Sequence, residues 1–184
     1  MSLPRWTGLT VLAALGLHAA SKPLAALPDL LWGCHVWSFL IALGLLLRAP
    51  RLTSMGLLCH LAVGLPSWLL EAAAAGTTAT SVLVHLLPPL LGFLDRRGQG
   101  LPRGTPWLAF ACSALLQLVC RLATPPALNV NMVFTGWPPL QRVFPSQLVY
   151  LAATDLLYLA LLLAVDLLLA RWWGRPADRE VALA

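Results

Sequence analysis

Six apolar stretches, each close to the length that a helix needs to cross a lipid bilayer, make up most of this 184-residue chain. A helix crosses the hydrocarbon core with about 20 residues, within a range of about 17–25. The segments between the stretches contain Pro, Gly, Lys or Arg, which are typical of loops. The approximate limits of the six stretches are 5–21, 28–47, 54–70, 78–94, 106–122 and 147–170.

The composition agrees with a protein that lies within a membrane. Hydrophobic residues make up 59% of the chain and charged residues 10%, whereas a soluble domain carries about 25% charged residues. Such a chain cannot cover its apolar surface with polar side chains, which excludes a soluble globular domain, a disordered chain and a nucleic-acid-binding protein. We therefore predict an all-α, polytopic membrane helix bundle of about six transmembrane helices, in which residues 1–184 form one domain.

The distribution of Lys and Arg predicts the orientation of these spans. With six spans, the N-terminus, the second and fourth loops and the C-terminus share one side of the membrane. An excess of Lys and Arg marks the cytoplasmic side, so we expect both termini to be cytoplasmic, with an external loop at 123–146 and a cytoplasmic tail at 171–184. The first side holds nine basic residues and the other three: Arg5, Arg48, Arg51, Arg96, Arg97, Arg103, Arg171, Arg175 and Arg179 against Lys22, Arg121 and Arg142.

The first apolar stretch has two interpretations. Arg5 precedes it, as a basic residue precedes the apolar region of a secretory signal peptide, but Leu17 and His18 are too large for the −3 position of a cleavage site. We therefore expect this stretch to be retained as the first span. We then expect a multi-pass protein of a cell membrane, of the kind found in the bacterial inner membrane, and no nucleic acid or soluble protein as a partner.

Polar side chains within the spans gather in the outer half of the membrane. At a rise of about 1.5 Å per residue, Cys34, His35 and His85 lie about 9–10 Å below the outer surface, and Asp155 lies about 12 Å below it. Ionisable groups within a membrane are costly and usually face the interior of the bundle. His60 and Asp166 alone belong to the cytoplasmic half. This convergence predicts a site that opens toward the outer leaflet.

The external loop and the span ends add to this polar group. His18, Gln117, Cys120 and Thr124 belong to the outer ends of the first and fifth spans. The loop is longer than about 15 residues, and loops of that length are usually functional or disordered. Its Pro, Trp and Phe residues indicate a folded cap over the polar side chains.

Each of these residues also has an ordinary structural interpretation. His18 suits an interfacial histidine, and His60 suits a hydrogen bond between helices. Asp155 suits an ion pair with Arg121 or Arg142, and the Pro88-Pro89 pair suits a kink in the fourth span. For the pair Cys34 and His85 we favour a functional role.

The other cysteines follow no pattern that indicates chemistry. The four cysteines lie in apolar stretches without CxxC spacing, which argues against a disulfide framework or a zinc site. Small buried apolar side chains are their ordinary role. We predict no metal and no cofactor.

Three short motifs occur in a recognisable order. They are Gly33-Cys34-His35-Val36, then His85 followed by Pro88, then Asn129-Val130-Asn131-Met132. Over residues 28–170 this arrangement resembles the YwaF-type, transmembrane protein 164 family, whose members are described as integral membrane acyltransferases acting on phospholipids. The resemblance implies that Cys34 is a nucleophile and His85 its general base. It also implies that Asn129 and Asn131 orient the histidine or bind the ester carbonyl.

The chemistry is consistent without the family. A thiolate is a strong nucleophile, but a thiol in apolar surroundings needs a neighbouring histidine to take its proton. Attack of Cys34 on a phospholipid ester would give a thioester and release a lysolipid, and a second lipid hydroxyl would resolve the thioester. His35 is turned about 100° from Cys34 around the helix, whereas Ser38 shares the face of Cys34 and could line the pocket.

Two other functions fit the same residues. His35 and His85 share a depth, so they could ligate one haem in a redox protein, whereas His60 lies about 10 Å deeper. Alternatively, Pro66 and Pro88-Pro89 could mark the interrupted helices of a small transporter, or the chain could be a non-catalytic membrane scaffold. Replacement of Cys34 distinguishes an acyltransferase from these alternatives.

Overall fold

The computed structural model describes residues 2–144 and 146–174, and within these ranges every regular element is a helix. The prediction of an all-α protein is therefore confirmed for the described residues. In chain order the elements are α1 (Trp6–Ala20), η1 (Leu24–Leu31), α2 (Gly33–Leu47), α3 (Pro50–Cys59), η2 (His60–Gly64), α4 (Leu65–Ala75), α5 (Ala79–Arg96), α6 (Thr105–Ala123), η3 (Pro126–Leu128), η4 (Val130–Met132), α7 (Pro138–Gln141) and α8 (Gln147–Trp173).

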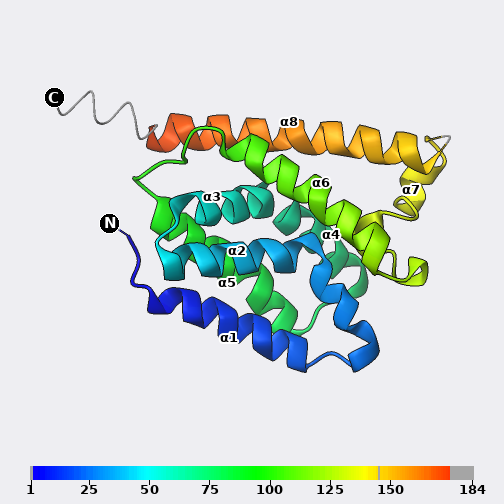
Figure 1. The fold of residues 1–184 in the computed structure, drawn as a ribbon, viewed down its shortest axis with the longest axis horizontal. Helices are drawn as coiled ribbons and strands as arrows, with labels where there is room; N and C mark the ends of the chain where they lie inside the picture. Colours follow the sequence, from blue (N-terminus) through cyan, green and yellow to red (C-terminus); the bar gives the residue numbers. More distant parts are fainter. Residues whose placement is uncertain (1, 145, 175–184) are drawn as a thin grey trace.

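The long helices lie side by side and alternate in direction along the chain (Figure 1). The helices α3 and α4 continue one another through η2, which is a π-helical turn. As a result, the first residues of α1 and the last residues of α8 lie at the same end of the bundle (Figure 1).

Three helices among the described residues are long and apolar enough to cross a membrane. They are Pro50–Ala75 with 26 residues, Thr105–Ala123 with 19 and Gln147–Trp173 with 27. A fourth candidate consists of η1 and α2, which are bent by 69° relative to one another. The other two predicted stretches correspond to α1, an apolar helix of 15 residues, and to α5, an 18-residue helix that ends in Asp95-Arg96.

Residues 28–47 do not form one straight helix. Trp32 has ψ 137°, which interrupts the helical backbone between η1 and α2. Cys34 therefore lies in the first turn of α2. The predicted depth of Cys34 assumed a continuous helix from Pro28, and the 69° bend removes that assumption.

Small residues allow α1, α2 and α3 to pack closely at one end of the bundle. A Cβ atom at Gly8 of α1 would lie 2.6 Å from the backbone oxygen of Ala42 in α2. A Cβ at Gly44 of α2 would collide with the side chain and backbone of Thr53 in α3. In a membrane, where lipid is as apolar as the side chains, such close backbone packing is a main source of helix association.

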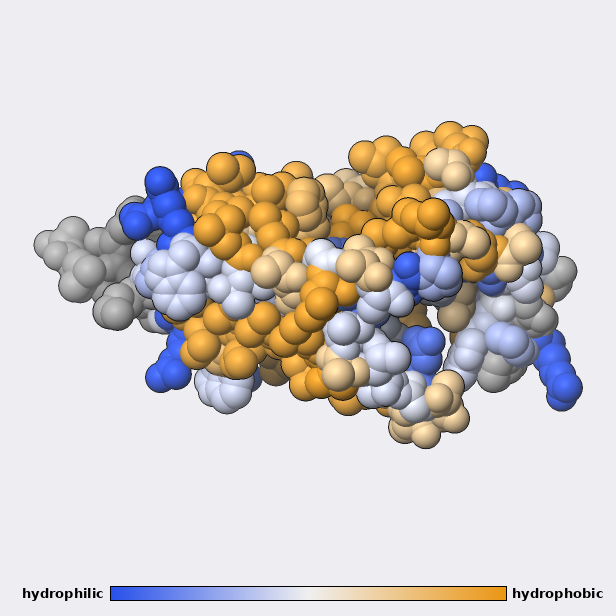
Figure 2. All heavy atoms as spheres, turned by 90° about the horizontal axis from the view of Figure 1, so that it is seen from below, coloured by the Kyte–Doolittle hydropathy of each residue, from blue (hydrophilic) through white to orange (hydrophobic). Residues whose placement is uncertain are grey.

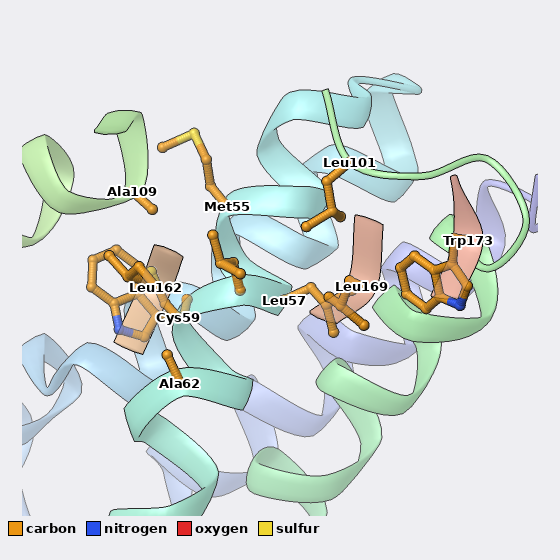
Figure 3. Close-up of a cluster of buried hydrophobic side chains, with 11 residues drawn as sticks. Met55, Leu57, Cys59, Ala62, Leu101, Ala109, Leu162, Leu169 and Trp173 are labelled. Carbon is orange, nitrogen blue, oxygen red and sulfur yellow. The ribbon is translucent and has the colours of Figure 1, made fainter. Parts of the chain in front are cut away.

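The hydrophobic core lies between α3, η2, α6 and α8. Figure 3 shows side chains from these helices converging, among them Leu57 and Cys59 of α3, Ala109 of α6 and Leu162 of α8. Leu57, Cys59, Ala109 and Leu162 are fully buried.

The outer surface of the bundle is apolar over its middle. On the face shown in Figure 2, hydrophobic residues cover most of the central region and hydrophilic residues gather toward the two ends. Large aliphatic side chains are exposed on α5, α6 and α8, among them Leu90, Leu118, Leu156 and Leu167. A contiguous apolar surface of this kind suits contact with lipid.

The long loop between α6 and α8 is folded. It contains η3, η4 and α7, and Val130 and Val133 are buried against Cys120 of α6 and residues of η1. The loop thus packs over the end of the bundle at which α2 begins, as the sequence predicted for a cap.

Candidate functional site

Asn131 holds the bend at which α2 begins. Its Oδ1 accepts a hydrogen bond from the Gly33 amide at 2.8 Å, and its Nδ2 donates to the Leu31 carbonyl at 2.8 Å. Nδ2 also lies 3.1 Å from Cys120 Sγ. Asn131 has φ +54°, a left-handed conformation that Asn tolerates better than most residues. Asn131 thus positions the backbone beside Cys34.

Asn129 stabilises the loop itself. Its Oδ1 accepts hydrogen bonds from the Phe134 and Thr135 amides at 3.0 and 2.9 Å. Its Nδ2 donates to the Thr135 carbonyl at 2.7 Å. These partners all belong to the loop, so the structure does not bring Asn129 to the histidines.

Three imidazole rings, which we call the imidazole row, form a line across α1, α2 and α5. The rings of His18 and His35 stack with centroids 5.0 Å apart, and His35 meets His85 edge to face at 5.9 Å. The Trp68 ring of α4 stacks on His85 at 4.9 Å. All four side chains are buried. The row therefore joins four helices at the end of the bundle where α2 begins.

Backbone carbonyls determine which ring nitrogen of His35 and of His85 is free to accept a proton. His85 Nδ1 lies 2.7 Å from the Ser81 carbonyl, and His35 Nδ1 lies 3.1 Å from the Asp29 carbonyl. Because a carbonyl only accepts, both Nδ1 atoms carry the proton in the neutral rings, and both Nε2 atoms are proton acceptors. His35 Nε2 is buried and has no hydrogen-bond partner among the described residues.

Ser81 and Trp68 hold His85 in addition to this carbonyl. Trp68 Nε1 donates to Ser81 Oγ at 3.1 Å, and Ser81 Oγ lies 3.5 Å from His85 Nδ1. Neither residue was predicted. Ser81 precedes His85 by one helical turn, so spacing could have indicated it. Trp68 contacts His85 only through the packing of α4 on α5, which spacing does not reveal.

Ser38 and His60 form a polar contact deeper in the bundle. Ser38 Oγ lies 3.0 Å from His60 Nε2, and both side chains have no exposed surface. Ser38 Oγ also lies 3.1 Å from the Val84 carbonyl of α5. In a regular helix, the N–H of residue 88 donates to the carbonyl of residue 84. Because Pro88 has no N–H, Ser38 Oγ is the donor to the Val84 carbonyl instead. His60 thus forms the hydrogen bond between helices that the sequence suggested.

Cys34 lies one turn before Ser38 on the same face of α2. The contact of Ser38 with Val84 therefore directs the face of α2 that carries Cys34 toward α5. Cys34 is half-buried, as is Cys112, whereas Cys59 and Cys120 are buried. Among the described residues, no imidazole nitrogen makes a hydrogen bond to Cys34 Sγ.

Asp155 lies apart from this group. Its Oδ1 accepts a hydrogen bond from Gln117 Nε2 at 2.7 Å, which joins α8 to α6. Arg121, one of its suggested ion-pair partners, donates instead to the Val133 carbonyl and lies over the Phe134 ring. The structure therefore brings His35 and His85 into contact and places Cys34 and Ser38 one turn apart on α2, with Asn131 bonded to the Gly33 amide. Asn129 and Asp155 lie apart from these residues.

The imidazole row does not fit a haem. A haem held by His35 and His85 would lie between the two rings, but these rings are in contact, and His18 and Trp68 stack at the two ends of the row. In the part of the chain that the structure describes, no three His, Cys, Asp or Glu side chains are placed to hold a metal ion.

Over the described residues, the chain is all-helical, with helices long enough to span a membrane and with buried histidines and a half-buried Cys34 at one end. No family model, no curated protein and no solved structure matches the chain.

Proposed function

We propose that this protein is an integral membrane acyltransferase that moves a fatty acyl group between phospholipids through a thioester on Cys34. One observation carries the proposal. The Ser38 contact with the Val84 carbonyl turns the face of α2 that bears Cys34 toward the turn of α5 that bears His85. The likeness of the motifs to the YwaF-type, transmembrane protein 164 family supports the same pair of residues.

The proposal includes six membrane crossings, with both termini in the cytoplasm. In this arrangement α1, η1 with α2, the helix Pro50–Ala75, α5, α6 and α8 each cross once. The alternating direction of the helices (Figure 1) supports it. So does the position of the arginines, because residues such as Arg5, Arg48 and Arg103 lie at helix ends that share one end of the bundle. The Cys34 end then belongs to the outer leaflet of the cell membrane.

In the first half of the reaction, His85 Nε2 takes the proton of the Cys34 thiol as Sγ attacks the carbonyl carbon of a phospholipid ester. The bond from that carbon to the glycerol oxygen breaks. The proton on His85 passes to the departing oxygen, which leaves as the hydroxyl of a lysolipid. Cys34 then carries the acyl group as a thioester.

In the second half, a hydroxyl of another lipid attacks the thioester carbon while His85 takes its proton. The carbon–sulfur bond breaks, and the proton returns to the Cys34 sulfur. Catalytic hydrogen bonds often shorten only when substrate is bound, so the approach of Cys34 Sγ to His85 Nε2 belongs to the substrate complex. Ser81 and Trp68 fix the tautomer and the ring of His85.

The test is lipid turnover by the purified protein in vesicles that contain a phospholipid with a labelled acyl chain. Cys34→Ala should abolish transfer of the label. Cys112→Ala is the matched control, because Cys112 is also half-buried in a helix, and it should leave transfer unchanged. Transfer that persists in Cys34→Ala at the wild-type rate would overturn the proposal.

A small transporter is the second candidate. The π-helical turn His60–Gly64 interrupts the regular α-helix between α3 and α4, and α5 contains the Pro88-Pro89 pair. Interrupted helices form transport sites in many carriers. Transport should not depend on a thiol, so a solute flux that survives Cys34→Ala would favour this candidate.

A further inference from the structure

Six arginines are exposed at the end of the bundle opposite Cys34. We call this set the arginine end. Each lies at a helix terminus or directly beside one, and the alternation of the helices brings these termini to one end (Figure 1). The six are Arg5, Arg48, Arg51, Arg97, Arg103 and Arg171.

None of these six guanidinium groups has a carboxylate partner among the described residues. The ion pair at this end joins Asp95 to Arg96, and both of those side chains are buried. Asp95 also accepts a hydrogen bond from the Leu3 amide. Asp166, the other described acidic residue toward this end, is buried as well. The exposed charge of the arginine end is therefore entirely positive over the described residues.

Three exposed tryptophans place these arginines at the depth of lipid headgroups. Trp6 follows Arg5, Trp172 follows Arg171, and Trp107 lies one turn after Arg103. Their exposed fractions are 64%, 78% and 59%, whereas Trp37 and Trp68 are buried. Exposed Trp side chains are typical of the boundary between hydrocarbon and headgroups. The neighbouring guanidinium groups then reach the phosphates.

We propose that the arginine end binds the headgroups of anionic phospholipids. Guanidinium groups bind phosphate oxygens with two parallel hydrogen bonds, and an ammonium group does not. Six groups around one end of a bundle face a ring of headgroups rather than one small anion. Anionic lipids are therefore retained at this end in preference to zwitterionic ones. This interaction does not depend on acyl transfer at Cys34.

The basic residues at the Cys34 end of the bundle serve as a control for the arginine end. Lys22 pairs with Asp29 at 3.5 Å. Arg121 is committed to the Val133 carbonyl and the Phe134 ring. Arg142 is exposed and is the remaining basic residue described at that end. A single charge of this kind gives little selectivity between lipids.

The test uses the full chain, purified and placed in nanodiscs of phosphatidylcholine with a minor fraction of phosphatidylglycerol. Native mass spectrometry after release counts the lipids of each kind that stay bound. Each neutralised arginine should lower the preference for phosphatidylglycerol by roughly fivefold. The variant that combines Arg5→Gln, Arg103→Gln and Arg171→Gln should therefore lose most of it. Arg142→Gln should change it by less than about twofold.

Lysine variants and a measurement of helix content serve as controls. The same three positions changed to Lys should retain more of the preference than the Gln variant, and circular dichroism should show equal helix content in all variants. Three results would overturn the proposal: an unchanged preference in the Gln variant, an equal loss in Arg142→Gln, or displacement of the bound lipid by inorganic phosphate, which would indicate a site for a free anion.

Discussion

The two ends of the bundle use polar residues in opposite ways. At the arginine end, six arginine side chains are exposed without a carboxylate partner among the described residues, and the helices beneath them pack closely through Gly8 and Gly44. At the end that holds the imidazole row, uncharged polar side chains are buried and contact one another. Exposed charge costs nothing in contact with water or headgroups. Buried polar groups are costly within a membrane and are usually functional.

This contrast explains why the imidazole row is the better candidate for chemistry. His35 Nε2 and His60 Nδ1 are buried without a partner among the described residues, and an unsatisfied polar atom costs about 1–3 kcal/mol. The buried atoms without a described partner toward the arginine end are the hydroxyls of Thr53 and Ser54. An imidazole nitrogen can take up a proton near neutral pH and a hydroxyl cannot, so the unpartnered groups that suit proton transfer are the histidines.

The largest effect is expected from His85. In His85→Gln the proton acceptor for Cys34 is lost, so acyl transfer should fall about 10²–10⁴-fold. His18→Gln, at the end of the row that stacks on His35 rather than on His85, should retain most of the activity. Initial rates of label transfer in vesicles measure both variants. Equal losses in the two variants would mean that the row acts as a structural unit only.

Asn131 should matter more than Asn129. Asn131→Ala removes the acceptor for the Gly33 amide and the donor to the Leu31 carbonyl, and the free energy of unfolding should fall by about 1–3 kcal/mol. Asn129 has the same left-handed backbone and bonds only within the loop, so Asn129→Ala should cost less. Chemical denaturation in detergent gives both values. A larger cost at Asn129 would contradict the role of Asn131 in holding α2.

Two glycines test the close packing near the arginine end. A Cβ at Gly44 would collide with Thr53, so Gly44→Ala should destabilise the protein by about 1–3 kcal/mol. Gly16 of α1 has nothing within 4 Å of an added Cβ, and Gly16→Ala should be neutral or stabilising by up to about 1 kcal/mol. Thermal unfolding ranks the two. Equal melting temperatures would mean that α2 and α3 can separate freely.

The smallest effect is expected from Ser38. In Ser38→Ala, both His60 Nε2 and the Val84 carbonyl lose their hydrogen bond to Ser38 Oγ. The free energy of unfolding should fall by about 1 kcal/mol, as for other hydrogen bonds between membrane helices. Ser54 Oγ is buried with no partner among the described residues, so Ser54→Ala should cost nothing. If Ser54→Ala were the more damaging change, the Ser38 contact would not be what joins α2 to α5.

The sequence was sufficient for what depends on periodicity and hydropathy. It predicted the helices, the common end of Cys34, His35 and His85, and the hydrogen bond of His60. It did not predict the bend at Trp32, because Pro28 and its apolar neighbours are compatible with a straight span. It also did not predict that His18 would stack on His35 or that Asp155 would bond to Gln117. Those contacts depend on which helices become neighbours, and the spacing of residues along one helix does not determine that.

The most direct test of the central claim is detection of the thioester. After incubation of the reconstituted protein with phospholipid, mass spectrometry of peptides should show an acyl group on Cys34 that hydroxylamine removes. Cys112 should carry none, and His85→Gln should greatly slow the appearance of the acyl group. Acylation of Cys34 and Cys112 to the same extent, or of neither, would contradict the account.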